Sequence, residues 1–386
     1  MNFDRSSLVQ LSMASSLYIH IPFCLKRCVY CNFVSGVYDP EKLSSYIDAL
    51  QIETEKIPAE TPLSTLFIGG GTPTVLPAEI LHNLLLCLFD HFIFNDNFEA
   101  TIESNPGTLS DEKLQIIISS GINRISLGVQ SFNDKELTFL GRIHGSKQAE
   151  QAVTMARKAG FKNISIDLIY GIPGQSLNSW KHTLENTVRL NPYHISSYEL
   201  TVEQGTALSR SALDRDEEEI IDMYDYAVDW LSSQGFIHYE ISNFARPGYE
   251  CRHNMNYWDR GDYYGAGLGA HSLIDNQRLR NTDDLKNYIR LITRNESPAR
   301  VIDHISDEKA LSEAIFLGLR KTGGITIETL AMRYKVNILS KYRKVIEDLQ
   351  TAGLIIVSPS GCSDETNIIL TRKGLLLSNE VFEKFV

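Results

Sequence analysis

The chain has 386 residues, 43% of them hydrophobic and 22% charged, which is the composition of an ordinary globular protein. Its length predicts one large domain and a smaller one, or two of medium size. The formal net charge of −11 disfavours a nucleic-acid partner, because no local cluster of Lys and Arg opposes the negative field. No run of about 18 apolar residues predicts a membrane span. The first 16 residues lack a secretory signal, so we expect a cytoplasmic protein; a peripheral contact with the inner face of a membrane stays compatible with this.

The first 238 residues alternate short apolar runs with longer amphipathic segments. Runs bounded by Gly, Pro or Asn predict strands at residues 17–22, 65–68, 98–103, 124–129, 163–168 and 194–200. The amphipathic segments predict helices at residues 40–55, 77–89, 111–119, 147–159, 177–190 and 216–234. Six strand–helix units in series predict an α/β fold whose parallel sheet is covered by helices, as a closed or a partial barrel.

The remaining third of the chain has a different pattern. Residues 239–272 are rich in Gly, Asn, Tyr and Trp with little periodicity, which predicts a long functional connection. Helices are predicted at residues 283–293, 307–319, 326–334, 339–352 and 373–384, and strands at 354–357 and 367–370. The order of the last elements is typical of a winged helix. We therefore predict a short extension (1–16), a (β/α)6 barrel (17–238), a connecting segment with a helix (239–299) and an α+β winged-helix-like domain (300–386).

Polar and glycine-rich signals follow five of the predicted strands. A cysteine cluster follows the first strand, and the glycine run at residues 69–71 follows the second. Glu103 ends the third strand, Gln130 follows the fourth, and Asp167 lies near the end of the fifth. Because the carboxyl ends of parallel strands share one edge of a sheet, these signals predict a single site.

The cysteine cluster has the spacing C-x3-C-x2-C and consists of Cys24, Cys28 and Cys31. Thiolates are strong ligands for iron–sulfur clusters, and three of them leave one iron of a [4Fe–4S] cluster open. In radical S-adenosylmethionine (SAM) chemistry, SAM binds that iron and is cleaved reductively to a 5′-deoxyadenosyl radical. The alternative is a structural zinc site, but such sites favour C-x2-C pairs and four ligands, and the second pair is missing.

Several motifs resemble the oxygen-independent coproporphyrinogen III oxidase family of radical SAM proteins. They are GGGTPT, ESNPG, SLGVQSF, LGRIH and SIDLIYGIPGQ, and the resemblance runs from about residue 16 to the C-terminus. It implies that Tyr18, Gly70 and Glu103 contact the cluster-bound SAM and that Tyr30 packs on its adenine. In the oxidase, a second SAM is contacted at the positions of Gly71, Thr72, Gln130, Arg142 and Asp167. Taken singly, each of these residues also suits a tight turn, a helix cap or a surface position.

Three features favour the heme chaperone branch of that family. The oxidase has a fourth cysteine where this chain has Phe33, and a longer segment before its first strand. The segment HNMNYW, residues 253–258, matches the HNxxYW motif of the chaperone branch. The resemblance implies heme as a ligand, with His253 as the leading candidate for contact and Tyr257 and Trp258 lining the site. Histidine is a common heme ligand, although a buried structural role is the alternative.

The branch also implies partners: heme-accepting respiratory proteins of the membrane and a small electron-donor protein. Of the other candidate side chains, Cys251 suits either a heme ligand or an inert thiol, and His271 is a lesser candidate. Cys87 lies in an apolar helical run and is expected in the core, and Cys362 lies in a predicted hairpin turn.

Three functions stay open from the sequence. The first is a heme chaperone that carries a cluster and SAM. The second is the coproporphyrinogen III oxidase, which removes a β-hydrogen from propionate side chains so that they decarboxylate to vinyl groups. The third is a DNA-binding regulator that uses the winged helix, which the acidic charge disfavours. Reductive cleavage of SAM is an expected capacity, and no residue is assigned as catalytic.

Overall fold

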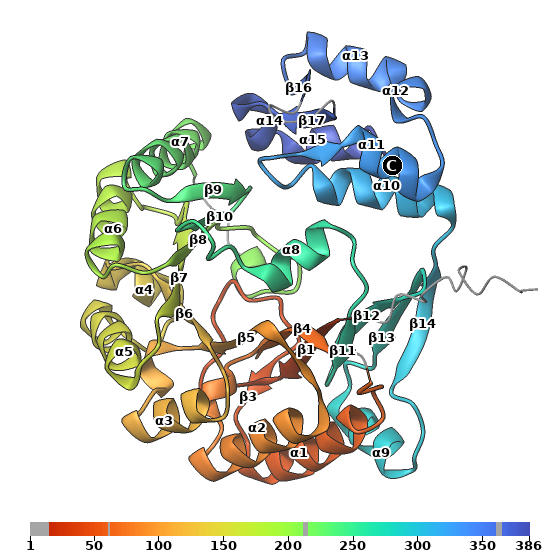
Figure 1. Cartoon of the computed structure of the whole chain (residues 1–386). Coiled ribbons are helices and arrows are strands. Elements are labelled where there is room, and N and C mark those ends of the chain that lie inside the picture. Colours follow the sequence, from red (N-terminus) through yellow and green to blue (C-terminus); the bar gives the residue numbers. More distant parts are fainter. Residues whose placement is uncertain (1–14, 61, 211–214, 360–364) are drawn as a thin grey trace, which may run out of the picture.

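The structure, a computed structural model, describes residues 15–60, 62–210, 215–359 and 365–386. All six predicted strands are present and pair in parallel in chain order. They are β1 (Ser16–Ile21), β4 (Leu63–Gly70), β5 (Phe94–Ser104), β6 (Arg124–Gln130), β7 (Asn163–Tyr170) and β8 (His194–Glu199). The predicted α/β fold with a parallel sheet is therefore confirmed (Figure 1).

Three short strands extend this sheet to nine. β11 (Tyr264–Ala266) pairs in parallel with β1, β10 (Asn243–Ala245) runs antiparallel to β8, and β9 (Ile237–Glu240) pairs with β10. The order is β11-β1-β4-β5-β6-β7-β8-β10-β9, so β11 and β9 are its two edge strands. The sheet is a strongly curved partial barrel rather than a closed one (Figure 1).

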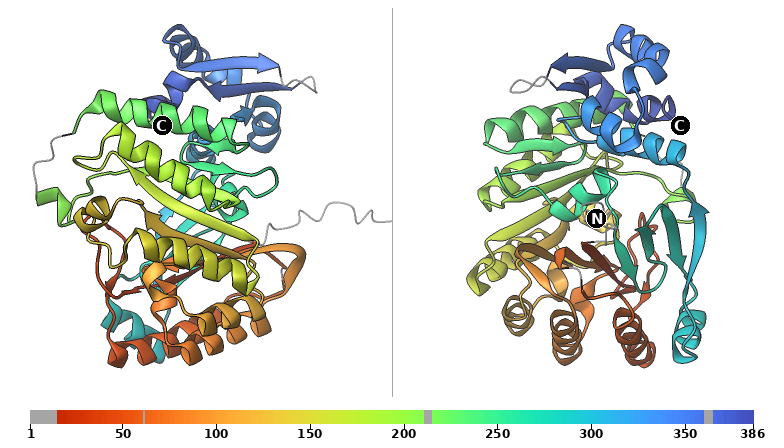
Figure 2. Two further views of the ribbon diagram at one scale, coloured as in Figure 1. Left: turned by 90° about the vertical axis from the view of Figure 1, so that its left-hand side faces the viewer. Right: turned by 45° about the vertical axis from the view of Figure 1, so that its right-hand side comes forward.

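Helices cover the outer face of the curved sheet (Figure 2). They are α1 (Pro40–Thr54), α2 (Ala78–His91), α3 (Asp111–Ser119), α5 (Ser146–Ala159), α6 (Leu177–Arg189) and α7 (Glu217–Ser233), close to the predicted bounds. Side chains of Asp39, Ser110, Ser176 and Asp216 accept backbone N–H groups at four of their N-termini. A short α4 (Asp134–Phe139) lies between β6 and α5.

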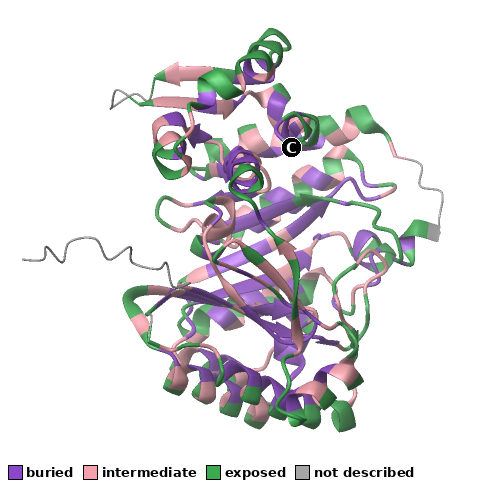
Figure 3. Ribbon diagram, turned by 90° about the vertical axis from the view of Figure 1, so that its right-hand side faces the viewer, coloured by how far each residue is buried: buried purple, intermediate pink, exposed green. Residues whose placement is uncertain are grey.

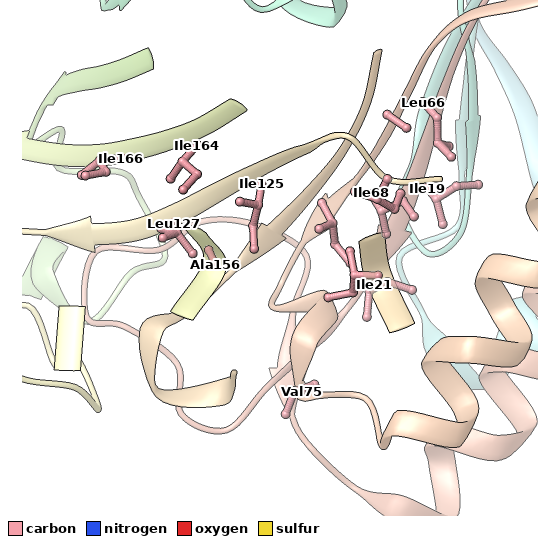
Figure 4. Packing of buried hydrophobic residues seen from close by; sticks show 14 of the residues in the cluster. Ile19, Ile21, Leu66, Ile68, Val75, Ile125, Leu127, Ala156, Ile164 and Ile166 are labelled. Carbon is pink, nitrogen blue, oxygen red and sulfur yellow. The ribbon is translucent and has the colours of Figure 1, made fainter. Parts of the chain in front are cut away.

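The parallel strands have an apolar outer side and a polar inner side. On β6, Ile125 and Leu127 are fully buried in the core with Ala156 of α5 (Figure 4). Successive side chains of a strand point to opposite faces, so Arg124 and Ser126 face the interior of the barrel. The same alternation places the labelled isoleucines and leucines of β1, β4 and β7 under the helices. Figure 3 shows the resulting buried layer between the sheet and its helices.

Residues 239–272, predicted as a connection with little periodicity, contain several short regular elements. This stretch contains the end of β9, all of β10 and β11, α8 (Arg252–Trp258) and the start of β12 (His271–Ile274). Elements of three to seven residues carry too little periodicity to be recognised. β12, β13 (Gln277–Asn281) and β14 (Ala299–His304) form an antiparallel sheet, with α9 (Leu285–Thr293) between β13 and β14.

The C-terminal elements form a separate unit with its own apolar core. Its helices are α10 (Asp307–Gly318), α11 (Ile327–Tyr334), α12 (Ile338–Lys341), α13 (Arg343–Thr351), α14 (Arg372–Leu376) and α15 (Ser378–Glu383). Its strands, β15 (Ile325–Thr326), β16 (Ile355–Pro359) and β17 (Thr366–Leu370), pair in the order β15-β17-β16. This confirms the winged-helix-like expectation. The predicted domain boundaries stay predictions, and the one at residue 300 falls inside β14.

Two small features complete the described chain. β2 (Phe23–Cys24) pairs in parallel with β3 (Gly36–Val37) and closes the loop after β1, and single turns of 3-10 helix lie at residues 73–75, 106–108 and 208–210. Among the described residues, no helix combines the length and the apolar character needed to cross a membrane.

Candidate functional site

A cavity of about 620 Å³ lies inside the partial barrel. A volume of this size is typical of a site for a small molecule or cofactor. Most residues that the sequence predicts for the site line it: Tyr18, Cys24, Cys28, Tyr30, Cys31, Gly70, Gly71, Thr72, Glu103, Gln130, Arg142, Asp167, His253 and Tyr257. The cavity therefore brings together residues from six strands, from the loops that follow them and from helix α8. Their roles stay predictions.

The three cysteines lie on the loop between β1 and α1, half-buried and unpaired as thiols. The Arg142 guanidinium donates from Nη1 to Cys28 Sγ at 3.3 Å, and the Thr72 hydroxyl lies 3.7 Å from Cys24 Sγ. A cation and a hydroxyl donor facing the sulfur atoms suit the negative charge of thiolates. This donor set fits an iron–sulfur cluster.

The described residues contain no group of three His, Cys, Asp or Glu side chains placed to hold a single metal ion. In a [4Fe–4S] cluster each thiolate binds a different iron, so the sulfur atoms do not need to meet at one point. The cluster interpretation of Cys24, Cys28 and Cys31 is therefore unaffected, and four ligands for a structural zinc ion are not gathered here.

The glycine run after β4 shapes the cavity wall. The Gly70 N–H donates to Glu103 Oε2 at 3.0 Å, and Gly70 has a φ of +104°, which favours glycine. A Cβ on Gly69 would lie 2.7 Å from the Glu103 carboxylate, and one on Gly71 would lie 2.7 Å from the backbone oxygen of Phe23. Glycine is thus required at these positions because other parts of the chain pack closely against them. The absence of side chains there leaves room for the Glu103 carboxylate in the cavity wall. Burial and the nearby Asp167 raise the pKa of Glu103 to about 7.

The Asp167 carboxylate is fixed by three serines, two on the neighbouring strands β6 and β8 and one on its own strand β7. It accepts hydrogen bonds from Ser126 at 2.9 Å, Ser196 at 2.8 Å and Ser165 at 3.3 Å. Burial nevertheless raises the pKa of Asp167. Arg124, only 2% exposed, also lines the cavity, so a buried cation balances these carboxylates.

Strained backbone marks the end of β6. Gln130 has a φ of +71° where the pairing with β7 shifts register. Such a conformation is uncommon for a residue with a side chain and clusters at functional sites. Arg142 reaches the same place and donates from Nη2 to the Gly128 oxygen at 2.5 Å. The structure therefore supports the predicted grouping of Gln130 with Arg142 at this edge.

Two tyrosines of the predicted SAM site occupy different walls. The Tyr18 hydroxyl lies 3.0 Å from His20 Nδ1, and burial raises the pKa of Tyr18. Tyr30 lies between Cys28 and Cys31 and packs against a small apolar cluster that includes Ile169. Both rings thus have one face or edge on the cavity.

Helix α8 carries the HNMNYW segment and lies inside the barrel (Figure 1). His253 is only 1% exposed, and burial lowers its pKa to about 3. Its Nδ1 lies 2.8 Å from Thr65 Oγ1 and its Nε2 lies 2.9 Å from the Tyr257 hydroxyl. The ring stacks on Phe67, with centroids 5.1 Å apart. Both nitrogens of His253 therefore have partners within the chain.

The remaining candidate residues have different positions, and only Cys251 among them lines the cavity. Trp258, expected to line the site, is not part of the cavity wall; the Arg320 guanidinium of the C-terminal unit lies over its ring at 4.4 Å. His271 is exposed on β12, whereas Cys251 is buried and lines the cavity. Cys87 is half-buried on α2 rather than fully in the core, and Cys362 lies outside the described residues.

Sequence reasoning missed several cavity residues, including Arg124, Ser126, Ser196 and Tyr198. On β6, Arg124, Ser126, Gly128 and Gln130 recur at every second position. This alternation is the signal that could have identified them, because it places polar groups on the inner side of otherwise apolar strands.

Comparisons with known proteins agree with this architecture. The radical SAM superfamily matches residues 18–186, and the HemN C-terminal domain matches residues 305–377. A solved structure of coproporphyrinogen III oxidase (HemN) from Escherichia coli, described as a radical SAM enzyme, superposes with a TM-score of 0.85 at 24% identity. The match covers 98% of this chain and 91% of that one and shows the shared fold.

Curated relatives match at higher identity over nearly the whole chain. The heme chaperone HemW of Lactococcus lactis is 37% identical over 382 residues, which is 97% of this chain and 98% of the relative. That of Bacillus subtilis is 38% identical over 96% and 99% of the two chains, and that of Mycobacterium tuberculosis is 35% identical over 95% and 93%. Membership of the radical SAM superfamily implies a [4Fe–4S] cluster and SAM. The chain belongs to the HemW family of radical SAM proteins.

Proposed function

We propose that this protein is a heme chaperone that binds heme in the barrel cavity and delivers it to membrane respiratory enzymes. The observation that carries the proposal is that α8, with its HNMNYW segment, lines the same cavity as the three cysteines. The proposal also draws on the name heme chaperone given to relatives that match nearly the whole chain. An electron-donor protein and heme acceptors are its expected partners.

Cys24, Cys28 and Cys31 would hold the cluster, which, once reduced by the electron-donor protein, would supply the one electron that cleaves SAM. Around them, Tyr18, Gly70 and Glu103 are proposed to contact SAM. Because Glu103 is fixed by the Gly70 N–H, its second oxygen can accept a hydrogen bond from an ammonium group such as that of SAM. Thr72, Gly71, Gln130, Arg142 and Asp167 are proposed for the second SAM position, and Tyr30 for the adenine.

The hydrogen bonds around His253 fix its tautomer. The Thr65 hydroxyl donates to Ser16 Oγ at 2.9 Å, so it accepts from His253 and the proton lies on Nδ1. The Nε2 lone pair then accepts from the Tyr257 hydroxyl. A neutral imidazole with a free Nε2 lone pair is the form that binds heme iron. His253 is therefore proposed to contact heme after its bond to Tyr257 is broken.

Heme titrations of two variants test this proposal. His253→Ala should weaken heme binding, whereas Tyr257→Phe should keep it or strengthen it, because only the competing hydroxyl is lost. The measurement is the Soret absorbance of protein reconstituted anaerobically with iron and sulfide. If both variants weaken heme binding equally, His253 and Tyr257 only stabilise helix α8. If His253→Ala binds heme with unchanged affinity, His253 is not part of the heme site.

Oxidation of coproporphyrinogen III is the second candidate function. The TM-score of 0.85 with the oxidase favours it, because the two chains share the fold that surrounds this cavity. Phe33 at the position of the oxidase's fourth cysteine counts against it. The two functions differ in one measurable outcome, which is the conversion of propionate to vinyl groups.

A further inference from the structure

The mouth of the cavity has an exposed aromatic surface. Phe33, on the cysteine loop, is 61% exposed, and Tyr198, at the end of β8, is 43% exposed. Both residues line the cavity. Large aromatic side chains that are exposed beside a cavity become buried when a ligand covers them, which is favourable for an apolar ligand. They therefore indicate a binding surface for such a ligand.

The same opening is polarised in charge. Lys26 and Arg27 line it on the cysteine loop, and Glu199 and Glu203 line it at and after the end of β8. Of these two carboxylates, Glu199 is ion-paired with Arg215 at 2.5 Å. Within the described part of the chain, no hydrogen bond or ion pair engages the Lys26 ammonium. Arg27 donates from Nη2 to the backbone oxygens of Cys31 and Phe33. The Arg27 cation and the Phe33 ring are therefore held on the same loop. In a chain of net charge −11, this is a local cationic edge.

We propose that this mouth binds the porphyrin by its edge, with the ring against Phe33 and Tyr198 and the carboxylates on Lys26 and Arg27. The inference rests on the proposed function, because it takes heme as the ligand. Heme is a flat apolar ring with two carboxylates on one side, and the opening offers aromatic side chains with two cations on the loop that carries Phe33. Glu203 repels carboxylates, so it disfavours the opposite orientation of the ring.

Paired variants of the reconstituted full chain test each half of the inference. Lys26→Gln is matched by Lys135→Gln, an exposed lysine on α4 outside the cavity wall. Phe33→Ser is matched by Val37→Ser, which is 63% exposed on the same loop but does not line the cavity. Each variant is titrated with heme and with heme dimethyl ester, whose carboxylates are masked, at equal iron content.

We expect Lys26→Gln to weaken binding of heme about threefold to fivefold, as for an exposed charge pair, and to leave the ester unaffected. Phe33→Ser should weaken both ligands about tenfold, as for an aromatic contact. The matched controls should bind as the wild type does. If the wild type binds heme but Lys26→Gln and Phe33→Ser behave as their controls, the mouth is not the porphyrin site and the inference is overturned. If the wild type shows no saturable heme binding, the proposed function itself fails.

Discussion

The carboxyl group of Glu103 should impose a stability cost that grows with pH. Its pKa is about 7 in the folded cavity, against 4.5 for the free side chain. Below pH 4.5 the group is neutral in both states and costs nothing. Between pH 4.5 and about pH 7 the carboxyl group is ionised in the unfolded chain but still protonated in the native state. The unfolded chain therefore binds fewer protons than the native state, and the free energy of unfolding falls as the pH rises. Above pH 7 the whole penalty is present.

The size of this penalty follows from the pKa difference. The change from 4.5 to about 7 corresponds to about 3 kcal/mol. Because part of the Glu103 side chain is open to the cavity, solvent screening reduces this, and we take about 2 kcal/mol. Glu103→Gln keeps an oxygen that can accept the Gly70 N–H but cannot ionise. The stability of the variant relative to the wild type should therefore rise with pH from 5 to 8 and reach an advantage of about 2 kcal/mol at pH 8.

Urea unfolding of the cluster-free protein at these two pH values measures the difference. Glu347→Gln, an exposed position on α13, is the matched control and should show no comparable change with pH. A Glu103→Gln stability difference that stays constant from pH 5 to pH 8 would refute the reasoning. The same variant should bind SAM more weakly in the reconstituted protein, since an amide offers no negative charge to an ammonium group.

Two further predictions concern the cluster and the junction with the C-terminal unit. Cys28→Ala should abolish the cluster absorbance and reductive SAM cleavage after anaerobic reconstitution, whereas Cys87→Ala, on α2, should retain both; a cluster in Cys28→Ala would contradict the ligand assignment. Glu313→Gln should destabilise the chain by about 3 kcal/mol in urea unfolding, because it leaves the buried Arg260, 3.0 Å away, without its charge partner. Glu308→Gln on the same helix removes an exposed ion pair and should cost less than about 1 kcal/mol; equal losses in the two would refute the argument from burial.

The fold was predictable where the apolar pattern is long. The six parallel strands of the barrel and the helices outside them could be predicted from the sequence. Each of them buries one side, and apolar residues recur on that side over several strand positions or at least one helix turn. β9, β10, β11 and α8 were missed because each has seven residues or fewer and is placed by tertiary contacts. The predicted helix at residues 339–352 is interrupted at Tyr342, which separates α12 from α13.

The candidate site was predictable where residues follow the strand ends. Cys24, Glu103 and Asp167 were found in this way, and they line one cavity. Residues deeper in the barrel, such as Arg124, were missed because a single charge at the start of an apolar strand resembles a surface position. Trp258 was misplaced because its neighbour Arg320 is distant in sequence, and only the packing of the C-terminal unit brings the two together.

The most direct test of the account is a pair of measurements on one anaerobically reconstituted preparation: heme titration and turnover of coproporphyrinogen III with SAM and a reductant. The account predicts saturable binding of heme by cluster-loaded protein and no conversion of propionate to vinyl groups. Turnover of coproporphyrinogen III, or the absence of saturable heme binding, would contradict it.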